Sequence, residues 1–196
     1  MPVLILVAIA WKSFPLIYLQ ERVPAEAELT LKVTGNSWRW DFEYPDLGVQ
    51  VTANLLDEAT ADREGRPYLL ATDAPLLVPV DTVVRVLVTS NDVIHSFAVP
   101  AFGIKEDAIM GRVNDTWFEA DRTGVFYGQC SELCGVNHAY MPVEIHVVSR
   151  AEFETWVAAQ GGSFPAPEAA APALPAASET PAPGEGAAPA ATPATP

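Results

Sequence analysis

The chain has 196 residues and a formal net charge of −14, with 25 Asp and Glu residues against 11 Lys and Arg residues. Such an acidic surface argues against nucleic-acid binding, which requires basic patches, and favours a basic partner that long-range attraction would steer. The alternative is that acidity only keeps the domain soluble, and charge alone does not separate the two interpretations.

The first 20 residues, MPVLILVAIAWKSFPLIYLQ, are apolar except for Lys12, Ser13 and Gln20. A helix needs ~20 such residues to cross a bilayer, so we expect residues 1–22 to be the outer part of a transmembrane helix whose beginning is trimmed or unusually short. Lys12 and Pro15 weaken the segment as an isolated span. A signal peptide is the alternative, but no cation precedes the apolar run and no small-residue cleavage site clearly follows it.

The middle of the chain, residues 27–161, has the size of one domain and is dominated by alternating apolar and polar positions. Turn residues separate short runs of β-branched and aromatic residues. This spacing predicts an all-β Greek-key sandwich or barrel. Residues 55–65 are polar and charged, and we expect a surface loop there. The predicted strands cover residues 28–34, 38–44, 75–80, 82–89, 96–99, 113–120, 124–129 and 142–148.

A short helix and a low-complexity tail follow the predicted strands. Ser149-Arg-Ala-Glu152 is a capping-box sequence, and the helix that it opens over residues 150–160 has one apolar face and stops at Gly161. Residues 162–196 consist almost entirely of Ala, Pro, Gly, Ser, Thr and Glu. Because this composition cannot bury enough apolar surface to offset chain entropy, we predict a disordered tail.

Both cysteines of the chain lie in Cys130-Ser-Glu-Leu-Cys134-Gly-Val-Asn-His138-Ala-Tyr-Met141, and a further histidine, His95, lies upstream. Thiolate, imidazole and thioether together form a ligand set that suits copper. The alternative is a secreted β-domain with a Cys130–Cys134 disulfide and no redox role. A plain disulfide, however, explains neither His138 nor Met141.

The two cysteines also bear on the number of metal ions. His95, Cys134, His138 and Met141 would suffice for a mononuclear blue-copper site, so a membrane-anchored mononuclear electron carrier is an alternative function. Cys130 would then be an unexplained thiol beside a copper thiolate, where it is prone to oxidation. Two copper ions bridged by both thiolates would use it fully. Each ion would take one imidazole and weak outer ligands, which suits fast electron transfer and leaves no position for a substrate.

The chain resembles subunit II of the haem–copper cytochrome c oxidases, which carries a dinuclear CuA centre in a cupredoxin-like domain. The resemblance covers roughly residues 1–160, and the segment Tyr127-Gly-Gln-Cys-Ser-Glu-Leu-Cys-Gly-Val-Asn-His-Ala-Tyr-Met-Pro142 carries it most specifically. It implies a membrane subunit that accepts electrons from cytochrome c and passes them to haem in subunit I, where oxygen is reduced. Its β-domain would face the periplasm of a bacterium or the outer side of a mitochondrial inner membrane.

The resemblance also implies a role for each ligand. In the family, two cysteines bridge the copper ions, a histidine and a methionine complete one ion, and a second histidine and a backbone carbonyl complete the other. Here the bridging residues are Cys130 and Cys134, the first ion takes His95 and Met141, and the second takes His138 and the Glu132 carbonyl. The Glu132 side chain would reach a magnesium or manganese ion at subunit I, although a solvent-facing loop carboxylate is the alternative. A structural subunit of a quinol oxidase that has lost its metal should lack several of these ligands.

Trp38 matches the family tryptophan through which electrons enter from cytochrome c. Because Trp38 and Trp40 share a face by parity, the alternative is that both are core residues, and we expect a twist or bulge at the strand end to expose Trp38. Arg39 between them places a cation near the entry point. Candidate acids for docking cytochrome c are Glu43, Asp46, Asp57 and Asp92, and candidate contacts with subunit I are Lys105, Asp107 and Arg112.

Overall fold

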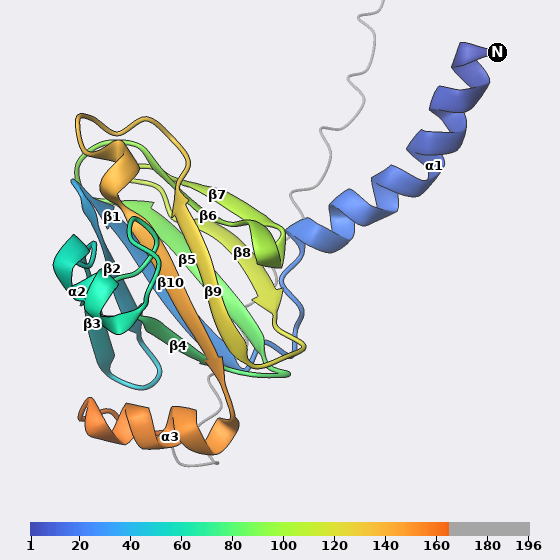
Figure 1. The fold of residues 1–196 in the computed structure, drawn as a ribbon. Helices are drawn as coiled ribbons and strands as arrows, with labels where there is room; N and C mark the ends of the chain where they lie inside the picture. Colours follow the sequence, from blue (N-terminus) through green and yellow to red (C-terminus); the bar gives the residue numbers. More distant parts are fainter. Residues whose placement is uncertain (165–196) are drawn as a thin grey trace, which may run out of the picture. The chain divides into compact units, whose positions relative to one another are not determined.

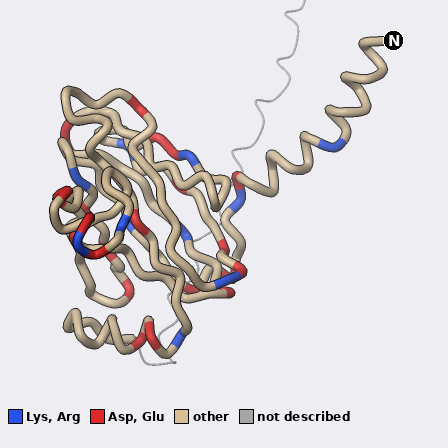
Figure 2. Tube along the Cα trace, viewed as in Figure 1, with Lys and Arg blue, Asp and Glu red and all other residues tan. Residues whose placement is uncertain are grey.

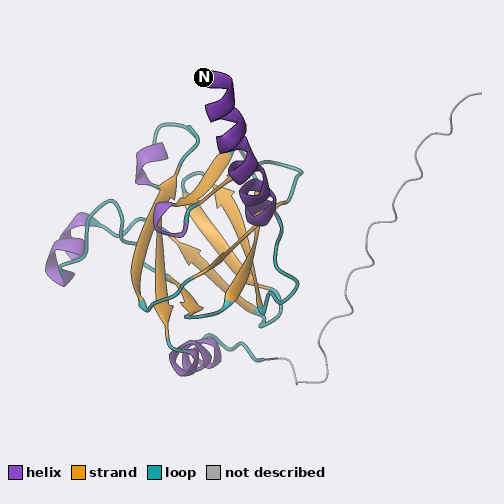
Figure 3. Ribbon diagram, turned by 90° about the vertical axis from the view of Figure 1, so that its right-hand side faces the viewer, coloured by secondary structure: helices purple, strands orange, loops and turns teal. Residues whose placement is uncertain are grey.

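The computed structural model describes residues 1–164, so the predicted disordered tail lies outside the described residues except for its first three positions. Two five-stranded sheets face each other (Figures 1 and 3) in the strand orders β3-β2-β1-β5-β8 and β4-β10-β9-β6-β7. The first contains β1 (Leu29–Asn36), β2 (Arg39–Tyr44), β3 (Val49–Ala53), β5 (Val83–Ser90) and β8 (Asn114–Glu119). The second contains β4 (Leu76–Pro79), β6 (His95–Val99), β7 (Ile104–Ala108), β9 (Gly124–Cys130) and β10 (Pro142–Val148).

The predicted all-β sandwich is confirmed, and all eight predicted strands are present with end points shifted by at most two residues. The prediction missed β3 and β7, which are both edge strands with only two buried residues each. β7 reads Ile-Lys-Glu-Asp-Ala, so its sequence is dominated by charges that tolerate the sheet edge. An edge strand pairs with only one other strand and packs only one face against the core. Few of its positions therefore need apolar residues, and the alternation in its sequence is weak.

The expected surface loop over residues 55–65 is wrong in part, because α2 (Glu58–Glu64) lies within it. The Asp57 carboxylate caps the helix by accepting a hydrogen bond from the Thr60 N–H at 3.0 Å, and Gly65 ends it at φ 65°. The helix buries only Ala61. It therefore has no apolar stripe, and caps rather than periodicity were the available signal.

The core between the sheets is aromatic on the side of β2. Trp40, Phe42 and Tyr44 alternate inward and are at most 1% exposed. The Phe97 ring packs edge-on against Trp40 at 5.6 Å and Phe42 at 6.4 Å between ring centroids, a geometry that adds about 0.5–1.5 kcal/mol per pair beyond area burial. Trp40 also contacts the His95 ring at 5.9 Å, so the core supports the residue that begins β6.

Two helices flank the β-domain in sequence. α1 (Pro2–Glu21) continues through Pro15, buries none of its residues, and is long and apolar enough to cross a membrane by length and composition. Apart from Lys12 and Glu21 it carries no charged side chain, whereas charged residues are spread over the β-domain (Figure 2).

The predicted C-terminal helix is confirmed as α3 (Arg150–Ala159), with the capping box formed between Ser149 and Glu152. Phe153 and Val157 are buried, and the Trp156 ring lies 5.6 Å from Tyr44 at the end of β2. α3 therefore covers one end of the sandwich (Figures 1 and 3), opposite the end where β1 turns into β2.

A buried carboxylate fastens the segment that contains α2 to the second sheet. Glu144 on β10 is 1% exposed. Its carboxylate accepts hydrogen bonds from the Arg66 guanidinium at 2.7 Å and the Thr72 N–H at 2.7 Å, and contacts His146 Nε2 at 2.8 Å. Burial alone would raise the pKa of Glu144, but these hydrogen bonds lower it below its ordinary value. We call this set of residues the Glu144 clasp.

Candidate metal centre

The residues predicted to bind metal meet where β9 and β10 are joined. We call residues 130–141, which connect these strands, the ligand loop. Its ends are held together because the Cys130 N–H donates to the Met141 carbonyl at 3.0 Å, while the Ser131 N–H donates to the Ser96 carbonyl on β6 at 3.0 Å. The loop is thereby closed next to His95, the first residue of β6.

The side chains form two matched contacts around a pair of sulfur atoms. The Sγ atoms of Cys130 and Cys134 are 3.8 Å apart. The Cys130 sulfur lies 3.8 Å from Nδ1 of His95, and the Cys134 sulfur lies 3.5 Å from Nδ1 of His138. The Glu132 carbonyl oxygen is 3.3 Å from the Cys130 sulfur. Each cysteine therefore has its own imidazole, although the cysteines come from one loop and His95 from another strand.

Four of the candidate ligands are buried. His95 is fully buried, Met141 is 1% exposed at the end of the ligand loop, and both cysteines are buried. Burial, followed by the proximity of Cys130, raises the pKa of the Cys134 thiol to about 12. A thiol that is protonated at neutral pH becomes a metal ligand by releasing its proton, so metal binding at this site would be coupled to pH.

The donor set fits copper. The two cysteines are free thiols, and their sulfur–sulfur distance of 3.8 Å is far longer than the ~2.05 Å of a disulfide bond. Soft thiolates and imidazoles are the ligands that copper prefers. His95, Cys130 and Cys134 offer ligand atoms that all lie within 4.8 Å of one another.

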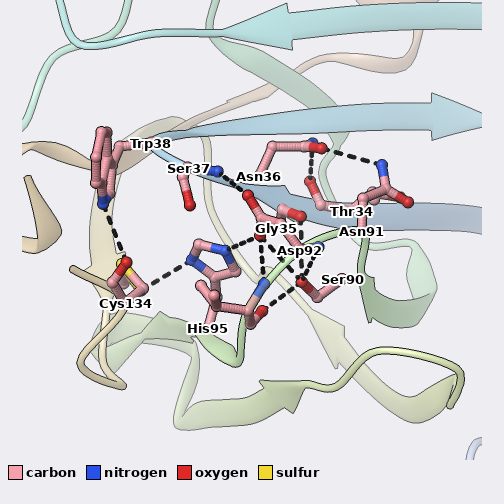
Figure 4. Close-up of polar contacts among 12 residues, drawn as sticks. Thr34, Gly35, Asn36, Ser37, Trp38, Ser90, Asn91, Asp92, His95 and Cys134 are labelled. Atoms are coloured by element: carbon pink, nitrogen blue, oxygen red, sulfur yellow. Dashed lines mark hydrogen bonds and ion pairs between the residues drawn. The ribbon is translucent and has the colours of Figure 1, made fainter.

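Trp38 and Trp40 occupy different environments, because Trp38 lies in the turn before β2 and not at a bulge within the strand. Trp38 precedes β2 and is half-buried, whereas Trp40 lies within β2 and is fully buried. The Trp38 indole Nε1–H donates to the Cys134 carbonyl at 3.2 Å (Figure 4). Gly135 permits this contact, since a Cβ at that position would lie 3.0 Å from the indole ring.

Asp92 belongs to the site and is not a free surface acid. One of its oxygens accepts a hydrogen bond from Nε2 of His95 at 2.9 Å, and the other accepts from the Ser37 N–H at 2.6 Å (Figure 4). Burial would raise the pKa of Asp92, but hydrogen bonds from His95 and from backbone N–H groups hold it well below its usual range. The sequence signal for this contact was the spacing Asp92-Val-Ile-His95.

The other candidate docking acids have different environments. Glu43 forms an ion pair with Lys32 at 3.0 Å, and Asp57 caps α2. Asp46 is exposed after the C-terminal end of β2, whereas Trp38 precedes its N-terminal end, a separation of ~20 Å along a strand of this length.

The candidate contacts with subunit I lie on and beyond an edge strand. Lys105 and Asp107 belong to β7, and Arg112 is exposed in the turn that follows. The Glu132 side chain is exposed within the ligand loop, while its carbonyl faces the Cys130 sulfur. His146 lies away from the ligand loop and contacts Glu144 in the clasp.

Residues 29–148 match the family model for the periplasmic domain of cytochrome c oxidase subunit II. This chain belongs to the cytochrome c oxidase subunit II family. Cytochrome c oxidase subunit 2 of Cereibacter sphaeroides is 42% identical to it over 181 residues, which are 83% of the chain and 59% of that protein. The probable cytochrome c oxidase subunit 2 of Rickettsia bellii is 45% identical over 160 residues, which are 81% of the chain and 59% of that protein.

Solved structures of relatives agree with this assignment. The periplasmic domain of subunit II of cytochrome oxidase of Bradyrhizobium japonicum is 50% identical with a TM-score of 0.66, over 71% of this chain and 97% of that one. A second structure captures a mixed disulfide between a thioredoxin-like protein and subunit II of cytochrome c oxidase; its similarity is 48% identity and a TM-score of 0.60, over 71% of this chain and 94% of that one. The resemblance inferred from the ligand loop is therefore confirmed at the level of family and fold.

Gly35 on β1 leaves the space that His95 occupies, because a Cβ at Gly35 would lie 2.7 Å from Cδ2 of the His95 ring. We expect Gly35→Ala to push the imidazole away from Cys130 and to weaken copper binding about 10–100-fold, the range for a lost supporting contact. Titration of the full chain with copper against a competing chelator measures this effect. Thr30→Ala, on the outward face of the same strand, should bind copper like the unmodified chain. Unchanged affinity in Gly35→Ala would show that the His95 position is not critical.

Proposed function

We propose that this chain is the electron-entry subunit of a respiratory cytochrome c oxidase. It would receive electrons from cytochrome c at a dinuclear copper centre and pass them to haem in subunit I. The observation that carries this proposal is the pair of free cysteines 3.8 Å apart, each with a different histidine Nδ1 beside its sulfur. A mononuclear site would use both histidines but only one of the two cysteines.

Cys130 and Cys134 would bridge the two copper ions. His95 and Met141 would complete one ion, and His138 with the Glu132 carbonyl would complete the other. Bound copper supplies a one-electron redox couple. The chain contributes rigidity, since the ligand loop is closed by hydrogen bonds to Met141 and to Ser96 on β6, and a rigid ligand set lowers the rearrangement that accompanies electron transfer.

Trp38 would be the point of electron entry. Its half-buried ring connects through one hydrogen bond to the Cys134 carbonyl, which belongs to a copper-bridging residue. Leu133 and Val136 in the ligand loop are 78% and 86% exposed, and exposed apolar side chains of this kind support protein docking. The net charge of −14 supports a basic partner such as cytochrome c.

The subunit would be anchored in a membrane by α1, with its β-domain in the periplasm. The exposed Glu132 carboxylate would reach a magnesium or manganese ion shared with subunit I, and Lys105, Asp107 and Arg112 would contact that subunit. These assignments follow the family. The chain spans 59% of the length of its relatives from Cereibacter sphaeroides and Rickettsia bellii.

The cysteine pair would also exchange with a thioredoxin-like protein, as the mixed-disulfide structure of a relative supports. A thiolate of a reduced dithiol partner would attack a Cys130–Cys134 disulfide and form a mixed disulfide, freeing one thiol. The second thiol of the partner would then displace the remaining cysteine. The chain would leave with two free thiols ready for copper, and the partner would carry the new disulfide.

The copper-to-protein ratio of the reconstituted full chain tests the proposed function. We expect two copper ions per chain and an electron paramagnetic resonance spectrum in which one unpaired electron is shared between two copper nuclei. A ratio of one, with a spectrum from a single copper nucleus, would instead identify a mononuclear carrier. Absence of copper binding would reject both.

A further inference from the structure

We propose that Asp92 is a positioning residue that fixes the His95 ring and thereby sets the affinity and reduction potential of the copper that His95 would bind. This inference rests on the proposed function for its copper readouts. The geometry that carries it is a continuous chain of contacts. Figure 4 shows its first part, from Ser37 through Asp92 to His95, and the chain continues from Nδ1 of His95 to the Cys130 sulfur.

The hydrogen bond to Asp92 decides which nitrogen of His95 is available. Nε2 of His95 lies 2.9 Å from the Asp92 carboxylate, which can only accept, so Nε2 carries the proton. Nδ1 is then left with its lone pair, and it lies on the side of the Cys130 sulfur at 3.8 Å. The imidazole is therefore prepared as a ligand before any metal arrives.

Asp92 is itself held in place. Its carboxylate accepts hydrogen bonds from the backbone N–H groups of Val93 at 2.6 Å and Ser37 at 2.6 Å, and its own N–H donates to the Ser90 hydroxyl at 3.2 Å. With these partners the carboxylate has little freedom to rotate towards solvent or a docking protein. Because Ser37 directly precedes Trp38, the same carboxylate also joins the turn that carries Trp38 to His95.

The charge of Asp92 should act on copper through the ring. A carboxylate on Nε2–H makes the imidazole a stronger electron donor at Nδ1, and a stronger donor favours the oxidised ion. Loss of Asp92 should therefore raise the reduction potential and weaken copper binding about 10–100-fold. An acid that only steers cytochrome c would change the association rate and its salt dependence, and would leave the potential unchanged.

The test compares Asp92→Ala with Asp46→Ala, which removes an equal charge at the opposite end of β2, in the full chain. In the metal-free chains, ¹⁵N spectra of His95 report the tautomer. We expect the Nε2-protonated form in the unmodified chain and in Asp46→Ala, and a mixture of tautomers in Asp92→Ala. In the copper-loaded chains, we expect weaker binding and a higher potential only in Asp92→Ala.

A conservative variant keeps the inference testable if Asp92→Ala does not fold. Asp92→Asn retains an accepting oxygen for Nε2–H but loses the charge, so we expect it to keep the tautomer and to raise the potential. If the Asp92 variants match Asp46→Ala in tautomer, copper affinity and potential, the inference is wrong while the proposed function stands. If the unmodified chain binds no copper pair, the proposed function is wrong, and the tautomer of the metal-free chain still decides the role of Asp92.

Discussion

Replacing Cys130 with serine should abolish the copper pair. A hydroxyl is a hard and weak ligand for copper compared with a thiolate, and Cys130 is the residue whose sulfur lies near His95, Cys134 and the Glu132 carbonyl together. We expect at most one copper ion per chain and a loss of electron transfer from cytochrome c of more than ~100-fold, beyond the loss from an outer-shell change. Copper analysis and stopped-flow kinetics with reduced cytochrome c measure the two effects.

Ser131→Ala is the matched control, because Ser131 is exposed and contributes a backbone N–H rather than its side chain to the loop closure. It should retain two copper ions and normal electron transfer. Retention of full electron transfer by a Cys130→Ser chain that holds one copper ion would support the mononuclear carrier. The far-ultraviolet circular dichroism spectrum should be unchanged in both variants. Serine is similar in size to the cysteine that it replaces at position 130, and Ser131 is exposed.

Breaking the Glu144 clasp should lower the free energy of unfolding more than the loss of an exposed ion pair does. Arg66→Met leaves the carboxylate of Glu144, which is 1% exposed, without its cationic partner. Removing one member of a buried ion pair costs about 3–5 kcal/mol, and because Arg66 is partly exposed we expect a loss of about 3 kcal/mol. Urea unfolding of the full chain measures the change. Arg150→Met removes exposed ion pairs with Glu28 and Glu154 and should cost about 0–1 kcal/mol.

The pH dependence of this loss identifies its cause. The pKa of Glu144 is lowered in the folded chain, so its carboxylate contributes stability that is present above the unfolded-state pKa and is lost as the pH falls through the folded-state pKa. The stability difference between the unmodified chain and Arg66→Met should therefore be largest near neutral pH and should shrink in acid. A difference that is constant with pH would point to lost packing of the Arg66 side chain instead.

Local sequence signals were sufficient to predict most strands, the C-terminal helix and the ligand loop of this protein. Alternation along residues 38–44 and 142–148 located β2 and β10, because each strand has one face in the core and needs apolar residues at every second position. The capping box at Ser149 located the start of α3. The ligand loop was readable because both cysteines, His138 and Met141 fall within 12 residues of sequence.

The tertiary structure decided what these local patterns leave open. Trp38 and Trp40 have the same parity, and only the turn before β2 and the contact with Cys134, 96 positions away in sequence, give them different environments. The bond from Ser37 to Asp92 spans 55 positions, and the bond from Arg66 to Glu144 spans 78. Local patterns record which face of an element is buried, whereas such partners are chosen by how the sheets pair and pack. For that reason the candidate ligands could be predicted from the sequence, and the groups that contact them from other strands could not.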